Sequence, residues 1–200
     1  MPLLHWSEKL RWAKGFSRKR NTTAPEHQTF KINHTRHVAS YLTYYPSPIG
    51  LLEITSTEEA ITAVLFAEGK TKPESALHPV CLRDCRAQLE DYFRGSLKAF
   101  DLPLRFEGTE FQMQVWTELS KIPYGKVTSY FSLARKVGNP HSVRAVGNTN
   151  VRNKLCLLLP CHRVLGNDGK LMSYAGGLWR KQWLLDHEQS HCGFRQLKLF

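Results

Sequence analysis

The sequence predicts an α+β protein of two lobes, a small antiparallel sheet lobe with a helix followed by a mostly helical lobe. Three extended segments separated by short turns come first, which is typical of an antiparallel meander. Amphipathic segments with helical spacing then fill most of the second half. The 200 residues, of which 42% are hydrophobic, are enough for one large folded unit or two small ones.

The first lobe is expected over residues 38–106. Residues 38–45, 51–55 and 60–66 read as strands, because they are rich in β-branched and aromatic residues and are bounded by turn-forming residues. The segment 82–93 has apolar residues at helical spacing, and Gly95 ends it. No catalytic pattern is evident in this half of the chain.

The second lobe is expected over residues 107–190, after a linking strand and loop at 101–108. Thr109 is a plausible N-cap for a helix over 110–120. Helices over 129–137 and 142–148 are joined by a glycine-containing turn, which is the form of a helix-turn-helix unit. In the second of these we expect Val143, Ala145 and Val146 to face inward and Arg144 to face outward. A basic helix over 179–187 ends the lobe.

Positive charge is spread over the whole chain. The net charge is +11, with +6 in residues 1–37 and +5 in the rest. This balance fits a polyanionic partner such as nucleic acid. Residues 1–37 are read as a basic, disordered extension; an organellar presequence or a localisation signal is the alternative. Residues 191–200 are expected to be a tail, and no run is apolar enough to span a membrane.

The five cysteines are odd in number and irregularly spaced, which argues against a disulfide framework. Cys81 and Cys85 lie one helical turn apart near His78, but a fourth zinc ligand is missing at a sensible spacing. The spacing therefore disfavours a zinc site at this pair, and neither a metal nor a cofactor is among our predictions.

One apolar stretch, residues 157–164, delivers Cys161 together with a histidine and an arginine. Such neighbours are expected to lower the pKa of a thiol and make it reactive. The alternative is an inert cysteine in the core. In both interpretations the apolar run itself is expected to be a buried core strand. A cysteine protease would show a different signature around its thiol, and a zinc site would need paired ligands.

The second lobe resembles the O6-alkylguanine-DNA alkyltransferases over residues 109–188. The shared motifs lie at 108–116, 122–125 and 128–130, then at 143–147 and Asn153. They continue with Pro-Cys-His-Arg-Val at 160–164, Tyr-Ala-Gly-Gly at 174–177 and Trp-Leu-Leu-Asp-His-Glu at 183–188. Residues 38–100 match only in outline.

The resemblance implies a monomeric DNA repair protein with a winged-helix-like second lobe. It would act on double-stranded DNA that contains alkylated guanine, and O4-alkylthymine is a further possible substrate. Cys161 would take the alkyl group irreversibly, and His162 would deprotonate it through a water, oriented by Glu188. Tyr130 would donate to the guanine, and Asn153 would tie the thiol-bearing turn to the recognition helix.

The resemblance also implies that the nucleotide is rotated out of the duplex, with Arg144 filling the gap in the base stack. The other expected DNA contacts are Gln112, Tyr130, Phe131, Asn139, Ala145, Gly147, Thr149 and Asn167. The expected base pocket is formed by Val164, Ser173, Tyr174 and Ala175.

Two positions depart from the family pattern. Lys154 and Cys156 stand where many relatives have prolines, and Cys156 is either a second alkylation site or a buried small residue. A non-catalytic DNA-binding module is the rival interpretation, against which Cys161 argues.

The implied location is the nucleus of a eukaryotic cell, or otherwise the cytoplasm.

Overall fold

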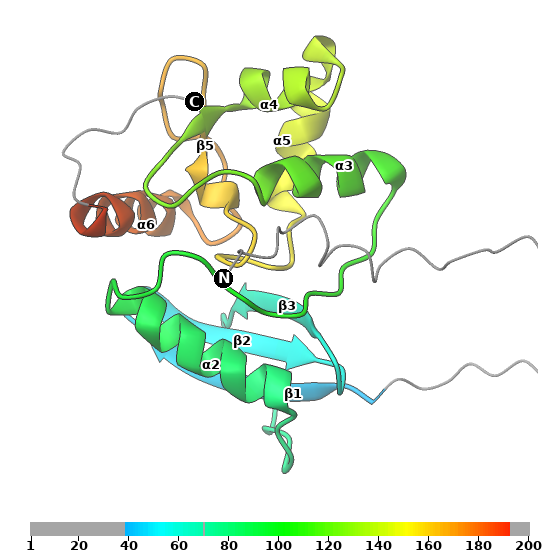
Figure 1. The fold of residues 1–200 in the computed structure, drawn as a ribbon, viewed down its shortest axis with the longest axis vertical. Coiled ribbons are helices and arrows are strands. Elements are labelled where there is room, and N and C mark those ends of the chain that lie inside the picture. The colour runs from blue at the N-terminus through cyan, green and yellow to red at the C-terminus, as the bar shows by residue number, and fades with distance from the viewer. Residues whose placement is uncertain (1–38, 70, 193–200) are drawn as a thin grey trace, which may run out of the picture.

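The computed structural model describes residues 39–69 and 71–192 as a sheet lobe and a helical lobe (Figure 1). The expected extension at 1–37 and most of the tail at 191–200 lie outside the described residues. Among the residues that are described, no helix is long and apolar enough to cross a membrane.

The sheet of the first lobe is an antiparallel meander of β1 (Tyr41–Ser47), β2 (Gly50–Ser56) and β3 (Ile61–Phe66). Its first hairpin pairs Ser47 with Gly50, so Pro48 and Ile49 form the turn. Gly50 takes φ +113°, a conformation that glycine adopts without steric cost. In β2, Leu52, Ile54 and Ser56 alternate inward, as expected for a half-buried strand.

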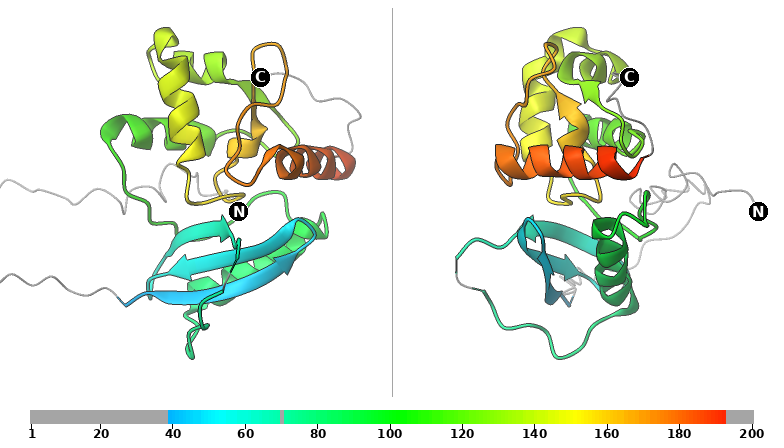
Figure 2. Two further views of the ribbon diagram at one scale, coloured as in Figure 1. Left: turned by 180° about the vertical axis from the view of Figure 1, so that it is seen from behind. Right: turned by 90° about the vertical axis from the view of Figure 1, so that its left-hand side faces the viewer.

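Helix α2 (Val80–Phe93) packs against one face of this sheet (Figure 2). Its buried stripe consists of Cys81, Leu82, Cys85, Leu89 and Tyr92. The predicted strands and helix of the first lobe are therefore confirmed, with ends shifted by a few residues.

The second lobe contains α3 (Glu110–Leu119), β4 (Thr128–Ser129), α4 (Tyr130–Lys136), η2 (Pro140–Ser142) and α5 (Val143–Val151). It continues with η3 (Cys161–Arg163), β5 (Val164–Leu165) and α6 (Leu178–His191). The side chain of Thr109 accepts a hydrogen bond from the Gln112 backbone N–H, which confirms the predicted N-cap. The strands β4 and β5 form a short parallel pair.

The edge strand β3 connects the two lobes. Val64 N–H donates to the carbonyl of Lys154 at 2.8 Å, and Cys156 N–H donates to the carbonyl of Val64 at 3.0 Å. The expected linking strand at 101–108 is reduced to a single bridge between Ile61 and Leu104. One hydrophobic cluster runs through both lobes, so their apolar faces are buried against each other.

The expectation that the apolar run before Cys161 is a core strand is wrong. Residues 155–166 are all buried, but residues 156–159, which precede the thiol, form a turn and a bend rather than a strand. Leu158 N–H donates to the carbonyl of Cys156, and Leu159 N–H donates to that of Leu155. Leu157 has φ 67°, the one positive φ among the described residues other than glycine. An all-apolar run fits a buried turn as well as a buried strand, so its pattern could not separate the two.

Candidate active site

The thiol of Cys161 lies at the start of η3 and is 2% exposed. Asn153, two residues after α5, donates from Nδ2 to the sulfur at 3.2 Å and to the carbonyl of Leu159 at 3.0 Å. Asn153 also accepts the backbone N–H of Leu155 at 2.9 Å. The side chain that follows the second helix of the helix-turn-helix pair thus holds the turn that carries the thiol.

The expectation that neighbouring groups lower the pKa of Cys161 below its ordinary value is wrong for this environment. Burial raises the pKa of the thiol, and the hydrogen bond from Asn153 and the charge of Lys181 only oppose that shift. The thiol is therefore held protonated, and a reaction through its thiolate needs a nearby base.

A buried carboxylate, Glu188 on α6, organises the groups beside the thiol. His162 Nε2 lies 2.8 Å from Glu188 Oε1. Arg163 binds the same carboxylate through Nε at 2.9 Å and Nη2 at 2.8 Å, and donates from Nη1 to the Ile122 carbonyl. The backbone N–H of Gly125 donates to Oε2 at 3.0 Å. This carboxylate is bound on both oxygens by charge-assisted hydrogen bonds.

The charges of this cluster follow from its contacts. Burial alone would raise the pKa of Glu188, but its interactions with His162 and Arg163, including their hydrogen bonds, hold it well below its usual value. Burial lowers the pKa of His162 against the attraction of Glu188. We therefore describe an ionised Glu188 beside a neutral His162. With Nε2 donating to Glu188, Nδ1 is the lone-pair nitrogen, and within the described part of the chain nothing donates to it.

Lys181, on α6 and fully buried, is a second cation near the thiol. Its Nζ donates to the carbonyl of Val164 at 2.6 Å and to that of Met172 at 3.2 Å. Burial lowers the pKa of this ammonium to about 8, and Cys161 opposes the shift. Lys181 thus fixes the chain just after the thiol and the loop that holds the expected base pocket.

Sequence reasoning missed Lys181, Arg163 and Asn150 as residues of the site. Asn150 Nδ2 donates to the carbonyl of Cys161 at 3.2 Å and to the hydroxyl of Tyr130 at 3.4 Å. A signal for Lys181 was present, because it shares the stripe i, i+3, i+4, i+7 of α6 with Leu184, Leu185 and Glu188. Charged residues on an otherwise buried stripe indicate a polar site inside the core.

Tyr130 begins α4 and is buried, with its hydroxyl 3.5 Å from the carbonyl of Ser173. Burial raises its pKa. Of the expected base pocket, Val164 and Tyr174 are buried, whereas Ser173 and Ala175 are exposed. Tyr130 is thus brought close to the loop that carries the expected pocket.

The helix-turn-helix pair α4 and α5 presents the residues expected to contact DNA. Arg144 is exposed as predicted, but Ala145 is also exposed, so the expectation that it faces inward is wrong. The buried stripe of α5 is Val146, Thr149 and Asn150, and this phase turns Ala145 outward. Because Thr149 is 4% exposed, its side chain does not belong to the outer surface where we expected it.

The remaining expected contacts lie on or near the surface. Phe131 is 42% exposed, Asn139 and Asn167 are exposed, and Gly147 is half-buried. The Asn139 side chain caps η2 by accepting the His141 N–H at 3.0 Å. The Gln112 side chain accepts the Thr109 N–H at 2.9 Å, which completes a capping box on α3.

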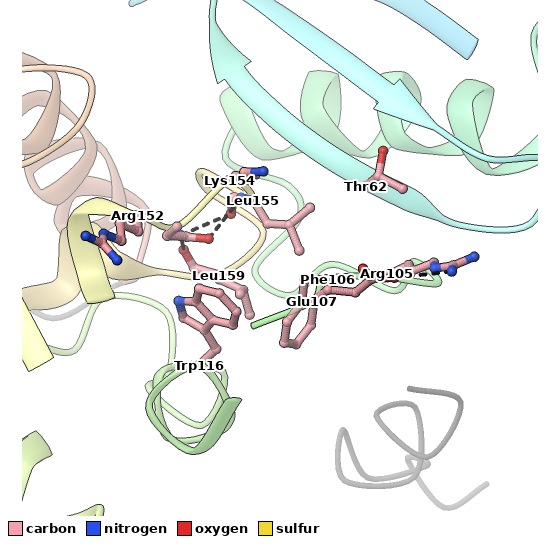
Figure 3. Close-up of a pocket in the computed structure, with 10 residues that line it drawn as sticks. Thr62, Arg105, Phe106, Glu107, Trp116, Arg152, Lys154, Leu155 and Leu159 are labelled. Carbon is pink, nitrogen blue, oxygen red and sulfur yellow. Dashed lines mark hydrogen bonds and ion pairs between the residues drawn. The ribbon is translucent and has the colours of Figure 1, made fainter. Parts of the chain in front are cut away.

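A cavity of about 260 Å³ lies between the lobes, next to Asn153 (Figure 3). Arg105, Arg152 and Lys154 line it together with Trp116. Cys161 is not among the lining residues, so this cavity is separate from the thiol. Asn153 is common to both, since it lines the cavity and donates to the sulfur.

The cysteines outside the site have structural surroundings. Cys85 is fully buried, and burial raises its pKa to about 12. Cys81 contacts the carbonyl of Thr57 at 3.6 Å. Within the described ranges, no group of three or more His, Cys, Asp or Glu side chains is arranged to hold a metal ion.

Fold and site define a class: a two-lobed protein in which a helix-turn-helix pair is tied to a buried cysteine that is followed by a histidine paired with a buried carboxylate. Two family models match the chain, the 6-O-methylguanine DNA methyltransferase ribonuclease-like domain at 40–106 and the DNA binding domain at 110–190. The chain belongs to the 6-O-methylguanine DNA methyltransferase family.

Relatives agree with this membership. A methylated-DNA–protein-cysteine methyltransferase of Methanosarcina acetivorans is 45% identical over 154 residues, covering 75% of this chain and 99% of the relative. A methylated-DNA–protein-cysteine methyltransferase of Haemophilus influenzae is 41% identical, and the match covers 76% of this chain and 87% of the relative. The fold is also similar to the crystal structure of the Mycobacterium tuberculosis O6-methylguanine methyltransferase, with a TM-score of 0.70 and 37% sequence identity. The match covers 77% of this chain and 95% of that chain.

Proposed function

We propose that this chain repairs DNA by direct reversal, moving the alkyl group of O6-alkylguanine onto Cys161. The observation that carries the proposal is the buried Cys161 thiol held by Asn153 beside the His162–Glu188 pair. A related structure, that of the M. tuberculosis enzyme in complex with DNA, is 38% identical with a TM-score of 0.68, which supports DNA as the partner.

The chemical step is a displacement at the alkyl carbon. The bond between Cys161 sulfur and that carbon forms while the bond from carbon to guanine O6 breaks, and its electron pair stays on guanine. His162 Nδ1 takes the thiol proton through a water, and Glu188 holds the imidazole. Tyr130 donates to the guanine ring, so the departing base gains the proton that makes it a neutral leaving group.

The product is a thioether, which has no easy hydrolytic exit. The protein is therefore consumed, one molecule for each lesion. No cofactor enters this balance, because the thiol supplies the nucleophile. The thiol proton stays on His162 and the proton that guanine gains comes from Tyr130, so His162 then releases a proton to solvent and Tyr130 takes one up.

DNA is bound by the face that α4 and α5 present. A base inside a duplex cannot reach a thiol that is 2% exposed, so the nucleotide is rotated out of the stack. Exposed Arg144 fills the gap, and Ala145 and Gly147 allow close approach to the minor groove. Gln112, Phe131, Asn139 and Asn167 contact the surrounding DNA, and the backbone near Thr149 belongs to the same surface.

The flipped guanine is received by Val164, Ser173, Tyr174 and Ala175. We assign residues 38–106 and 107–190 to the two lobes, and residues 1–37 to a basic extension that adds salt-dependent DNA affinity. The protein acts as a monomer, in the nucleus of a eukaryotic cell and otherwise in the cytoplasm. In the alternative form of the proposal, the extension is an organellar targeting signal, and O4-alkylthymine is repaired in addition to O6-alkylguanine.

The test is intact-mass spectrometry after incubation with a duplex containing O6-methylguanine, followed by peptide mapping. We expect one added CH2 group per protein, located on Cys161, and none with the unmodified duplex. Transfer that persists in Cys161→Ser, or its complete absence in the wild-type protein, would overturn the proposal.

A further inference from the structure

One oxygen of Glu188 is shared between the two lobes. The hydroxyl of Tyr92 donates to Glu188 Oε1 at 2.9 Å, and His162 Nε2 lies 2.8 Å from that same oxygen. Tyr92 comes from α2 in the first lobe, whereas His162 and Glu188 belong to the second (Figure 1). The carboxylate that orients the proposed base is therefore partly held by a side chain of the other lobe.

The Tyr92 ring is held from several sides. It is 1% exposed and packs against the rings of Phe93, Phe100, Tyr124 and His187. In addition, His187 Nε2 lies 2.8 Å from the backbone carbonyl oxygen of Tyr92. Two consecutive residues of α6, His187 and Glu188, thus bind one residue of α2, which leaves the hydroxyl little freedom to choose another acceptor.

We propose that Tyr92 is a positioning residue of the reaction, through which the first lobe fixes the Glu188 oxygen that faces His162. This inference rests on the proposed function. It gives the first lobe, which contains none of the proposed reacting groups, a role in the chemistry.

The effect on His162 follows from the donors that share Oε1, which are His162 Nε2, the Tyr92 hydroxyl and, at 2.8 Å, Arg163 Nη2. The Tyr92 hydroxyl takes up part of the negative charge of Oε1, so less of it acts on the imidazole. Without that hydroxyl, Glu188 would stabilise the protonated imidazole more strongly and His162 would become more basic. The other charged or titratable groups around the pair are Cys161, Arg163, Lys181, His187 and Tyr124, and the substitution changes none of them.

Tyr92→Phe tests this, with Tyr124→Phe as the matched control. Both variants keep their aromatic ring: the ring of Tyr92 is buried, and the half-buried ring of Tyr124 packs against it and under Arg163. The Tyr124 hydroxyl, however, has no hydrogen-bond partner within the described part of the chain. We would measure single-turnover alkyl transfer from an O6-methylguanine duplex between pH 5 and 9, and the titration of His162 by NMR, assigned with His162→Gln.

We expect Tyr92→Phe to raise the pKa of His162 by about one pH unit, the equivalent of a tenfold change in proton affinity. The acidic limb of the rate profile should move upward by the same amount, since the base must be unprotonated to accept the thiol proton. If the wild-type rate is flat down to pH 5, a new acidic limb in Tyr92→Phe alone supports the inference.

Unchanged profiles in Tyr92→Phe, or equal shifts in both variants, would overturn the role of Tyr92 while leaving the proposed function intact. Failure of the wild-type protein to accept an alkyl group is the separate outcome that ends the proposed function. Thermal unfolding of both variants shows whether a lower rate results from partial unfolding. Partial unfolding alone would not change the pKa of His162 in the folded protein.

Discussion

Cys156 and Cys161 stand at opposite ends of one buried apolar turn, yet their surroundings differ. They are 1% and 2% exposed, and burial raises the pKa of both thiols. Around Cys161, the Asn153 amide and the charge of Lys181 oppose that shift. The Cys156 sulfur contacts the carbonyl of Asn153 at 3.9 Å, and the neighbouring Cys161 raises its pKa further, while the Tyr174 hydroxyl opposes the shift.

In the proposed function, the reactive thiol of Cys161 is therefore distinguished from the thiol of Cys156 by its hydrogen-bonding and charged partners rather than by burial. Asn153 serves both cysteines, but it gives the Cys161 sulfur an N–H and the Cys156 thiol a carbonyl. An N–H stabilises a thiolate, whereas a carbonyl stabilises the protonated thiol. The same residue thus favours ionisation at one end of the turn and opposes it at the other.

The most severe test of this contrast is removal of each sulfur in turn. Cys161→Ser should abolish alkyl transfer, because the hydroxyl is a far weaker nucleophile at neutral pH. Cys156→Ser should retain transfer within about threefold. Labelled O6-methylguanine duplex and gel separation of labelled protein measure both. Label on Cys156 in the wild-type protein would break the contrast.

The next largest effect concerns the carboxylate beside Cys161. Glu188→Gln should lower the free energy of unfolding by about 3–5 kcal/mol at pH 7, because it leaves Arg163 buried without its carboxylate. The folded pKa of Glu188 lies below its ordinary value, so its contribution is complete above about pH 4.5 and is lost as the pH falls through the folded pKa.

Urea unfolding from pH 7 to pH 3 checks this sign. The stability difference between wild type and Glu188→Gln should be constant down to about pH 5 and shrink below it. A difference that grows toward acid would show that Glu188 is protonated in the native protein.

A smaller effect is expected from the amide that distinguishes the two sulfurs. Asn153→Ala should slow alkyl transfer about tenfold or more, since a hydrogen bond to a charged group contributes about 1.5–3 kcal/mol. Asn150→Ala is the comparison variant, because it removes an amide that binds the carbonyl of Cys161 and the hydroxyl of Tyr130 but not the sulfur. Rates are compared at a temperature where both variants are folded by circular dichroism. Equal slowing would assign Asn153 a purely structural role.

The smallest effect is expected at the inert thiol. Cys156→Val should change the free energy of unfolding by less than about 1.5 kcal/mol, because both side chains are small and apolar in a packed core. Guanidinium unfolding measures it. A loss of several kcal/mol would mean that the contact between Cys156 and the Asn153 carbonyl matters for the fold.

The local pattern of residue types was enough to predict most of the helices and strands. Alternating burial in β2, the Thr109 capping box and the stripe of α2 follow from nearest neighbours in the chain. The phase of α5 was misjudged at Ala145, because a small apolar residue satisfies either face of a helix. The turn before Cys161 was missed for a related reason, since its bends depend on Asn153 and on pairing with β3.

The sequence by itself determined the two-lobed α+β class, the identity of Cys161 and the family motifs around it, because these depend on residue type and spacing along the chain. Only the tertiary structure decided that Arg163, Lys181 and Tyr92 converge on the thiol and its carboxylate. Those contacts join segments far apart in sequence, and a buried charge is stable only where distant donors meet it. The difference between Cys161 and Cys156 therefore depends on contacts that only the tertiary structure creates.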